Sequence, residues 1–225
     1  MPLFYQHTIN EFSKLGIWKI EETEVFFSRK IPLQRDISHP HKRLQHLAGR
    51  YLLQFLFPDF PYELIKIADT RKPFLSNEAY HFSISHCGDF AAAIVSKLSR
   101  VGVDIELIKP MIQKVKHKFL GEGEMQLLSG NIVPSYEMMP QTHQSEASDP
   151  HSDVLTLCWS AKEAMFKWYG NGGVDFKNHM QLSDPIDFSR ENFIQSSYIF
   201  DKEIRVPLTV SSKIFGELVM SYVIS

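Results

Sequence analysis

Two kinds of hydrophobic periodicity divide the chain into helices and strands. From Pro40 to Phe57 apolar residues recur at helical spacing, and Pro58 ends the pattern, so we predict a long amphipathic helix there. From Val101 to Ile108 apolar and polar residues alternate instead, which predicts a strand with one apolar face. Asp104 and Glu106 then project together from the other face of that strand.

Further elements are predicted on both sides of that strand. Ala79 to Ser85 and Phe90 to Ser96 have the pattern of two strands joined by the turn His86-Cys87-Gly88-Asp89. Lys114 to Leu128 is predicted to be helical, and the polar segment Ser129 to Asp153 to be a loop whose role the sequence leaves open. Three more strands are predicted at Tyr198 to Phe200, Leu208 to Val210 and Leu218 to Ile224. No internal sequence repeat is evident, although a helix followed by a hairpin occurs in both halves.

A second helix is predicted around Trp159-Ser160-Ala161-Lys162-Glu163-Ala164-Met165-Phe166-Lys167. We expect Ser160 to cap it, with Glu163 completing a capping box. Trp159, Glu163 and Lys167 recur every four residues and therefore share one stripe of the helix. The alternative is an ordinary solvent-facing ion pair between Glu163 and Lys167, which stabilises a helix by only about 0.2 to 0.5 kcal/mol.

The two carboxylates of the predicted strand suit a magnesium ion. Residues on the same side of a strand are roughly 6.5 to 7 Å apart when they are two positions apart. Asp104 and Glu106 are therefore near enough to reach one hydrated Mg²⁺, which prefers oxygen ligands. The alternative is that both residues simply belong to the solvated face of a half-buried strand.

Composition describes a globular protein and excludes several classes. The chain has 225 residues, 44% of them hydrophobic and 22% charged, with a net charge of −2. That charge gives no reason to expect nucleic acid as a partner. Cys87 and Cys158 form no metal-binding or disulfide pattern. No apolar stretch is long enough to span a membrane, and Met1 to Tyr5 does not resemble a signal peptide, so we expect a cytoplasmic protein.

The order and combination of several motifs resemble the 4′-phosphopantetheinyl transferase superfamily, in the form whose single chain carries two similar halves. The family has a GVDIE-like strand and a WxxKEAxxK helix, which correspond to Gly102–Glu106 and Trp159–Lys167. Between them Lys118–Glu124 (KFLGEGE) resembles the family's approach to a helix with a Glu near its start. Upstream, Arg71–Phe74 (RKPF) and Phe82–Cys87 (FSISHC) resemble its (G)KP and SxSH passages.

The resemblance extends from about Lys42 to Tyr169 and contains one departure. The family's Gly before Lys-Pro is Arg71 in this chain, which puts the local turn in question and leaves Lys72 in place. The resemblance implies an α+β fold of two similar α/β subdomains in a pseudo-twofold arrangement, each a small antiparallel sheet packed with a long helix. Residues 1–100 are then the N-terminal subdomain with the coenzyme A 3′-phosphate contacts. Residues 101–225 carry the magnesium-binding strand and the WxxKE helix.

The activity that the resemblance implies is transfer of the 4′-phosphopantetheine arm of coenzyme A to a serine hydroxyl of an apo acyl or peptidyl carrier protein. Adenosine 3′,5′-bisphosphate is released, and the working form is a monomer. Family precedent makes Asp104, Glu106 and Glu163 the Mg²⁺ ligands and Glu163 the general base, directly or through water. Lys167 is expected at the pyrophosphate. Lys162 points about 100° away on the helix and has a lesser phosphate or packing role.

Coenzyme A also needs basic residues for its 3′-phosphate. Between residues 29 and 72 there are nine Lys or Arg against four Asp or Glu. The family-like positions are Arg43, Arg50 and Lys72, although Arg50 is equally placed to cover its own helix. Ser85 and His86 match the family's phosphate-contacting Ser-His pair, and the alternative for His86 is a turn histidine without a ligand.

Two other classes stay open. One is a non-catalytic coenzyme A or carrier-protein binding module, and the other is a Mg²⁺-dependent phosphohydrolase that uses the same carboxylates. The kind of carrier, whether from fatty-acid, polyketide or nonribosomal peptide synthesis, does not follow from the sequence. Carrier proteins are usually acidic, so the basic residues Lys114, Lys116 and Lys118 are expected to favour their approach.

Overall fold

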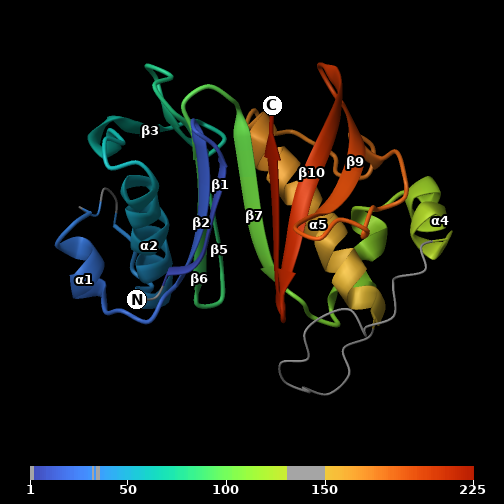
Figure 1. The fold of residues 1–225 in the computed structure, drawn as a ribbon, viewed down its shortest axis with the longest axis horizontal. Helices are drawn as coiled ribbons and strands as arrows, with labels where there is room; N and C mark the ends of the chain where they lie inside the picture. The colour runs from blue at the N-terminus through green and yellow to red at the C-terminus, as the bar shows by residue number, and fades with distance from the viewer. Residues whose placement is uncertain (1–2, 32, 34–35, 131–149) are drawn as a thin grey trace. The chain divides into compact units, whose positions relative to one another are not determined.

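A computed structural model describes residues 3–31, 33, 36–130 and 150–225 (Figure 1). The chain forms two compact units. Unit 1 comprises Met1–Ile105, Lys167–Asn171 and Ile224–Ser225, and unit 2 comprises Glu106–Phe166 and Gly172–Val223. The division therefore falls inside a strand and inside a helix, rather than between residues 100 and 101. Most of the predicted loop from residue 129 to 153 lies outside the described residues.

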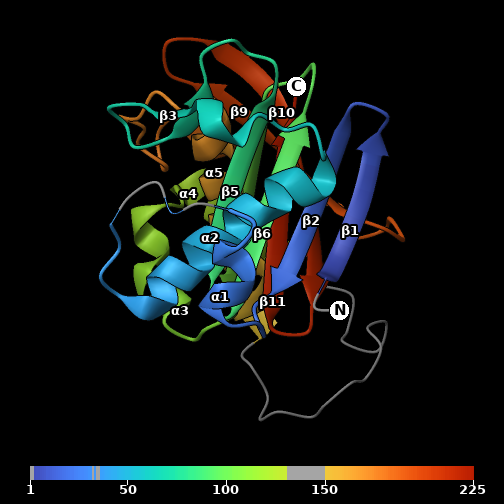
Figure 2. The ribbon, with the colours of Figure 1, turned by 90° about the vertical axis from the view of Figure 1, so that its left-hand side faces the viewer.

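Unit 1 is a four-stranded antiparallel sheet covered by one long helix. The strand order is β1-β2-β6-β5, and Figure 2 shows helix α2 lying across β5, β6 and β2. The bounds are β1 Leu3–Asn10, β2 Ser13–Lys19, α2 Pro40–Leu56, β5 His81–Cys87 and β6 Phe90–Ser96. The helix predicted from residue 40 and both strands of the predicted hairpin are confirmed. The hairpin of β1 and β2 was not predicted.

Local sequence explains where α2 begins and how it meets the sheet. Pro40 stands in the first turn, where a missing N–H costs nothing, and the His39 imidazole accepts a hydrogen bond from the Lys42 N–H at 3.4 Å. Gly49 allows close packing, because a Cβ there would lie 2.6 Å from Ile84 Cγ2 on β5. The apolar side of the helix is fully buried at Leu47, Ala48, Leu52 and Leu53.

An aromatic cluster fills one end of the unit 1 core around Trp18. The Trp18 ring centroid lies 5.1 Å from that of Tyr51 and 5.6 Å from that of Phe55, both on α2. Phe26 and Phe27 of the short helix α1 (Glu24–Ser28) approach the same indole at 6.5 and 6.4 Å. The Trp18–Phe26 pair is stacked and the other three pairs are edge-to-face, and such aromatic packing stabilises a core beyond its buried area.

The Lys-Pro passage forms a small hairpin of unit 1. It consists of the 3-10 turn η1 (Tyr62–Leu64) and the paired strands β3 (Ile65–Ile67) and β4 (Pro73–Leu75). Between the strands Arg71 has φ 66°, in the left-handed region that favours glycine. The turn expected of the family is therefore retained by an arginine, in a backbone conformation that strains an L-residue.

Unit 2 contains the remaining strands and four helical segments. Strands β9, β10 and β11 pair as an antiparallel meander, and β8 pairs with β9. Strand β7 and helix α5 pass from one unit into the other. The bounds are β7 Val101–Leu107, α3 Ile112–Val115, η2 Lys116–Lys118, α4 Glu122–Gly130, α5 Pro150–Tyr169, β8 Met180–Leu182, β9 Ile194–Asp201, β10 Arg205–Phe215 and β11 Leu218–Ile224.

Two details of the predicted helices are wrong. The helix expected from Lys114 to Leu128 is three short segments, and it is interrupted at Phe119 to Gly121. The helix of the WxxKE motif begins at Pro150, so Ser160 is an interior residue and not its cap. Pro150 is well suited to a first turn, where its fixed φ is helical and its missing N–H has no intrahelical partner.

The α+β class is confirmed, since antiparallel sheets and long helices occur in both units. The chain order strand, long helix, hairpin occurs twice, as β2, α2, β5 and β6 and again as β7, α5, β10 and β11, although most of β7 and the end of α5 belong to unit 1. The pseudo-twofold arrangement of the two remains a prediction. Over the part of the chain that the structure describes, no helix is both long and apolar enough for a membrane span.

Replacement of Arg71 by glycine should stabilise the protein by about 1 kcal/mol, because glycine takes the left-handed conformation without the clash of a Cβ. Denaturant unfolding measures this change. Asp69→Gly, in the same turn but without positive φ, is the control and should lower stability by about 0.5 to 1 kcal/mol. An Arg71→Gly protein that loses as much stability as the control would contradict the strain at this position.

Candidate functional site

Three residues from separate motifs form one hydrogen-bonded network in unit 1. Asp104 of β7 is 3% exposed, and Lys167 near the end of α5 places its Nζ 2.6 Å from the Asp104 Oδ1. The Ser85 hydroxyl of β5 donates to the same Oδ1 at 2.8 Å. Lys167 also donates to Ser85 Oγ at 2.8 Å. The carboxylate therefore has a charged and a neutral donor on one oxygen.

The SxS pattern of β5 explains how Asp104 is held in register. Ser83 Oγ accepts the Val103 N–H at 3.2 Å, and Ser85 Oγ accepts the Ile105 N–H at 3.3 Å. Serines two positions apart point to the same side of a strand, so both hydroxyls face the β7 backbone. The hydroxyl of Ser85 thus binds the carboxylate of Asp104 and the amide of the following residue at once.

His86 follows Ser85 at the end of β5 and is exposed at the surface. Partial removal of the imidazole from water lowers its pKa below the ordinary value, and the positive charge of Lys167 acts in the same direction. The ring is therefore neutral at neutral pH. Such a ring offers one donor and one acceptor to a ligand.

Lys72 lies at the C-terminal end of α5. Its Nζ donates to the Trp168 carbonyl oxygen at 3.3 Å, and the neighbouring Thr70 hydroxyl donates to the Gly170 carbonyl at 2.9 Å. Both bonds satisfy carbonyls that the end of a helix leaves open. Gly170 has φ 81°, and a Cβ at this position would lie 2.6 Å from Lys72 Cδ, so only glycine leaves room for the lysine.

A pocket of unit 1 brings Lys72 together with a second cation, Arg100. The pocket measures about 310 Å³, and His81, Tyr169 and Asn171 also line it. Burial lowers the pKa of Lys72 to about 8, and the charge of Arg100 adds to this effect. The pocket therefore offers two positively charged groups and several hydrogen-bonding side chains to an anionic ligand.

The other two arginines proposed for coenzyme A have protein partners. The Arg43 guanidinium donates to Glu24 Oε1 at 2.8 Å and to the Ile37 carbonyl at 2.7 Å. Arg50 is 6% exposed and lies 3.1 Å from His46 Nδ1. Arg43 keeps part of its surface in solvent, whereas Arg50 belongs to the buried side of α2.

In unit 2 the Glu106 carboxylate lies beside Trp159, whose indole Nε1 donates to Glu106 Oε1 at 3.1 Å. Both residues line a pocket of about 370 Å³. Its remaining walls are mainly apolar, with lysines among them: Leu107, Lys109, Met111, Ile112, Val115, Lys118, Phe119 and Thr156. Glu163 follows Trp159 by one helical turn and is half-buried.

Lys162 lies inside unit 2 and is fully buried. Its ammonium donates to the Phe119 carbonyl at 2.6 Å, to the Phe176 carbonyl at 2.9 Å and to Glu124, whose Oε1 lies 2.7 Å away. A lysine with three ammonium donors bonded in this way is a packing residue, and the phosphate role expected for Lys162 has no geometric support. Sequence analysis did not single out Glu124.

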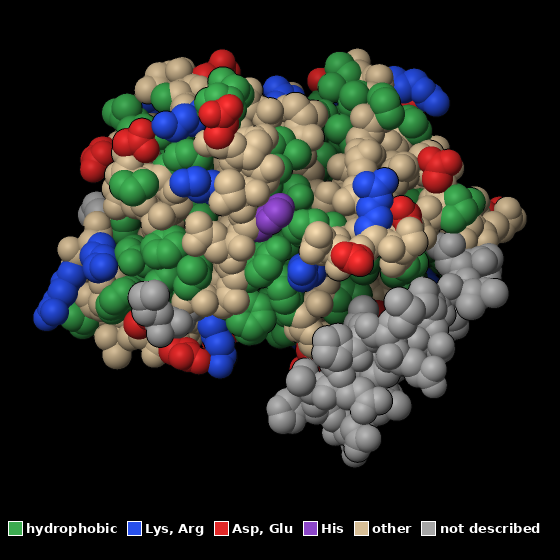
Figure 3. Space-filling model, in the orientation of Figure 1, with side chains coloured by type: hydrophobic (Ala, Val, Ile, Leu, Met, Phe, Trp, Pro, Cys, Tyr) green, Lys and Arg blue, Asp and Glu red, His purple; other side chains and the backbone are tan. Residues whose placement is uncertain are grey.

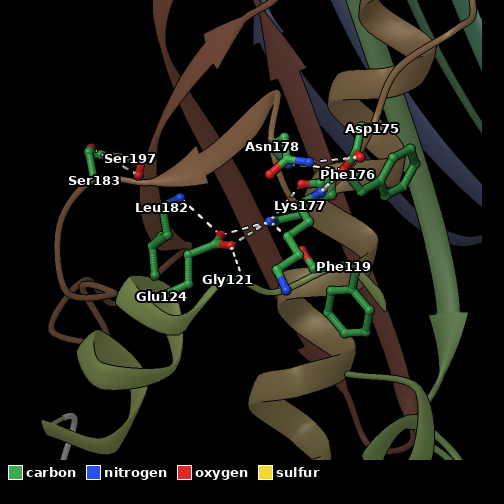
Figure 4. Close-up of polar contacts among 11 residues, drawn as sticks. Phe119, Gly121, Glu124, Asp175, Phe176, Lys177, Asn178, Leu182, Ser183 and Ser197 are labelled. Carbon is green, nitrogen blue, oxygen red and sulfur yellow. Dashed lines mark hydrogen bonds and ion pairs between the residues drawn. The ribbon is translucent and has the colours of Figure 1, made fainter. Parts of the chain in front are cut away.

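The Glu124 carboxylate joins several segments of unit 2 (Figure 4). It accepts the Gly121 N–H at 2.8 Å, as a capping-box glutamate at the third position of α4 does, and the Leu182 N–H of β8 at 3.0 Å. The spacing of Gly121 and Glu124 before a helix was the sequence signal for this role. Together with Lys162, the carboxylate connects α4, α5, β8 and the Phe176 loop.

The chemistry of the predicted metal ligands fits magnesium, whereas the described residues provide no ready-made cluster. Among residues 3–31, 33, 36–130 and 150–225, no group of three or more His, Cys, Asp or Glu is placed to hold a metal. Asp104, Glu106 and Glu163 offer carboxylate oxygens, the ligands that Mg²⁺ prefers. The ammonium of Lys167 on Asp104 also shows that this oxygen binds a cation.

Replacement of Lys162 by methionine should destabilise the protein by about 3 to 5 kcal/mol, because the carboxylate of Glu124 is then buried without its cation. The double variant Lys162→Met/Glu124→Gln should recover part of this loss, since the remaining group is neutral. Denaturant unfolding compares the two, with Lys114→Met at an exposed position as the control. A double variant no more stable than the single one would contradict the ion-pair role.

Stability should rise from about pH 8 to pH 10.5 through Lys72. Its pKa is about 8 in the folded protein and about 10.5 when unfolded, so the unfolded chain binds more protons between these values. Lys72→Met should remove this part of the pH dependence. Unfolding midpoints at pH 7.5 and 9.5 measure it, with Lys66→Met as the control. Equal pH dependence in Lys72→Met and the unmodified protein would refute the burial of this charge.

Comparison with known proteins finds several relatives. Enterobactin synthase component D of Escherichia coli (strain K12) is 33% identical over 129 residues, which are 56% of this chain and 54% of the relative. The 4′-phosphopantetheinyl transferase AcpT of Escherichia coli (strain K12) is 28% identical over 147 residues, 63% of this chain and 68% of the relative. The 4′-phosphopantetheinyl transferase psf-1 of Bacillus pumilus is 30% identical over 94 residues, 42% of this chain and 34% of the relative.

The match spans about half the length of the enterobactin synthase relatives. A family model described as the 4′-phosphopantetheinyl transferase superfamily matches residues 100–223. This stretch is more than half of the chain and contains Asp104, Glu106, Glu163 and Lys167. The chain therefore belongs to the 4′-phosphopantetheinyl transferase superfamily.

Proposed function

We propose that this protein transfers the 4′-phosphopantetheine arm of coenzyme A to a serine hydroxyl of an apo acyl or peptidyl carrier protein, with release of adenosine 3′,5′-bisphosphate. The network of Ser85, Asp104 and Lys167 is the observation that carries the proposal. It joins three family motifs through a carboxylate, an ammonium and a hydroxyl. These groups suit a reaction in which a metal ion and a pyrophosphate are bound together.

Magnesium is part of the proposal, with Asp104, Glu106 and Glu163 as the residues that would hold it. When bound, such an ion neutralises the charge of the pyrophosphate oxygens. The hydrogen bond from Trp159 keeps the Glu106 carboxylate oriented. The Ser85 hydroxyl does the same for Asp104. Both carboxylates are thus pre-oriented by donors of the protein, which lowers the cost of ordering them on binding.

Proton transfer and charge stabilisation are assigned to α5. In the proposal Glu163 accepts the proton of the carrier serine as its oxygen attacks the phosphorus, directly or through a water. Lys167 stabilises the charge that develops on the departing phosphate. The two side chains are four residues apart on one helix and therefore share a face.

Coenzyme A is proposed to be bound mainly from unit 1. The neutral His86 offers a ring N–H to phosphate oxygens, and Lys72 with Arg100 supplies two positive charges at one pocket. Ser85 is kept in this proposal, and its hydroxyl would have to turn from Asp104 to donate to a phosphate. Arg43 is retained for the 3′-phosphate because part of its guanidinium is exposed to solvent. Arg50 and Lys162 are left out, since both are buried against protein partners.

Other parts of the proposal rest on the sequence. They are a monomeric working form, a cytoplasmic location and an acidic carrier that approaches Lys114, Lys116 and Lys118. On the face drawn in Figure 3, basic and acidic side chains are interspersed, unlike the basic stripe that a nucleic-acid surface requires.

Incubation with coenzyme A, Mg²⁺ and an apo carrier protein, followed by mass spectrometry of the carrier, tests the proposal. We expect the carrier to gain the mass of one phosphopantetheine. Asp104→Asn should slow this gain by about 100-fold or more, since the neutral side chain neither attracts the metal nor pairs with Lys167. Asp89→Asn, at an exposed position of the β5–β6 turn, is the matched control and should react as the unmodified protein does.

Two results would overturn the proposal in different ways. Release of phosphate or nucleotide from coenzyme A in the absence of any carrier would indicate a phosphohydrolase. Tight binding of coenzyme A and of a carrier without any mass gain, across carriers of all three biosynthetic classes, would indicate a binding module.

A further inference from the structure

Lys167 is bonded to the carboxylate of Asp104, which the proposed function assigns to a metal ion. Its Nζ lies 2.6 Å from Asp104 Oδ1 and 2.8 Å from Ser85 Oγ, while the Ser85 hydroxyl donates to the same carboxylate oxygen at 2.8 Å. The Asp104 side chain is 4% exposed and the Lys167 side chain 25% exposed. The ammonium is thus the solvent-facing member of this pair, and it covers the oxygen on that side.

The ion pair gives the buried Asp104 side chain a positively charged partner in the metal-free protein. A carboxylate removed from water needs a positive partner close by, and at hydrogen-bond distance an ammonium provides both charge and a donor. Asp104 therefore does not require a metal to be stable. The same pair opposes a metal, because a divalent ion bound to this oxygen would lie within a few ångströms of the ammonium.

The side chain of Lys167 is suited to leave Asp104. A lysine has a flexible stem with four carbons, and its ammonium is a compact charge that can change partners without movement of the backbone. A pyrophosphate offers several negatively charged oxygens, so it competes well with one carboxylate for the ammonium. Once the ammonium is bonded to the pyrophosphate, the Asp104 oxygen is available to a metal.

We propose that the Lys167 ammonium, which we call the resident cation, prevents a metal ion from binding Asp104 until the pyrophosphate of coenzyme A binds. The ammonium then bonds to the pyrophosphate instead of Asp104. The inference rests on the proposed function, in which metal and coenzyme A share this site. Metal and coenzyme A then bind with positive coupling, and by thermodynamic reciprocity each raises the affinity of the other by the same factor. Lys167 therefore has two roles: it controls when the metal ion can bind Asp104, and it stabilises the charge on the departing phosphate.

Manganese binding, read from the electron paramagnetic resonance signal of free Mn²⁺, tests this without any turnover. The unmodified protein should bind Mn²⁺ weakly, and Lys167→Gln should bind it about tenfold or more tightly, because the repelling charge is gone. Glutamine keeps a hydrogen-bond donor near Asp104 and Ser85. Lys19→Met is the matched control, since Lys19 also lies 2.6 Å from a carboxylate, that of Glu21, at an exposed position. It should bind Mn²⁺ as the unmodified protein does.

A second comparison uses coenzyme A as the displacing ligand. Isothermal titration of the unmodified protein with coenzyme A should show a gain in affinity of about tenfold or more when Mg²⁺ is present. The gain should be clearly smaller in Lys167→Gln, where no ammonium has to leave. Lys167→Arg retains the cation and should keep the low Mn²⁺ affinity of the unmodified protein.

Three outcomes decide between the ideas. If Lys167→Gln and the unmodified protein bind Mn²⁺ with equal affinity, the resident-cation inference is wrong while the metal site stands. If neither binds Mn²⁺ even with coenzyme A present, the metal site fails and the inference with it. Circular dichroism shows whether Lys167→Gln is folded; if it is poorly folded, Mn²⁺ should restore its folding, and a failure to do so counts against the inference. The melting temperature of the control variant Lys19→Met should not change on addition of Mn²⁺.

Discussion

Compensation of buried carboxylates is the constraint that organises this molecule. An ionised carboxylate inside a protein is stable only with a positive partner and further donors, and this chain buries Asp104 in unit 1 and Glu124 in unit 2. Helix α5 supplies both partners, Lys167 and Lys162. The two lysines are five positions apart, so they leave the helix axis about 140° apart. The buried carboxylate of each unit thus pairs with a lysine of the same helix.

Elements with a helical period or a continuous apolar run could be predicted, including β6, which is buried at six of its seven positions, whereas the N-terminal hairpin of β1 and β2 was missed. The long helix α2 has one apolar side, and the strands β6, β7 and β11 were found within one residue of their ends. Strand β2 is buried at five of its seven positions, so Ser13–Lys19 lacks the alternation that marks a strand. The start of α5 was missed because Pro150 to Asp153 has the polar composition of a loop.

The sequence motifs identified residues that lie together in the structure, but the roles of the charged residues depend on which of them are buried. Ser85, Asp104 and Lys167 were singled out from motifs and lie within hydrogen-bond distance of one another. Helical position separated Lys167 from Lys162, but the sequence left a phosphate and a packing role open for Lys162, and only the structure shows that its ammonium is enclosed. The local excess of Lys and Arg between residues 29 and 72 likewise made Arg50 a candidate for binding coenzyme A, although Arg50 is buried.

The composition of unit 1 has a consequence for how the chain folds during synthesis. The unit is built mainly from residues 1–105, yet it also includes 167–171 and 224–225. Trp168 Nε1 donates to Ser225 Oγ at 2.9 Å, and Arg100 exchanges two backbone hydrogen bonds with Ser225. A ribosome-bound chain of about 110 residues therefore lacks the last pieces of its first unit. Asp104 is without Lys167 during that interval, and their ion pair forms only after the ribosome has made and released α5.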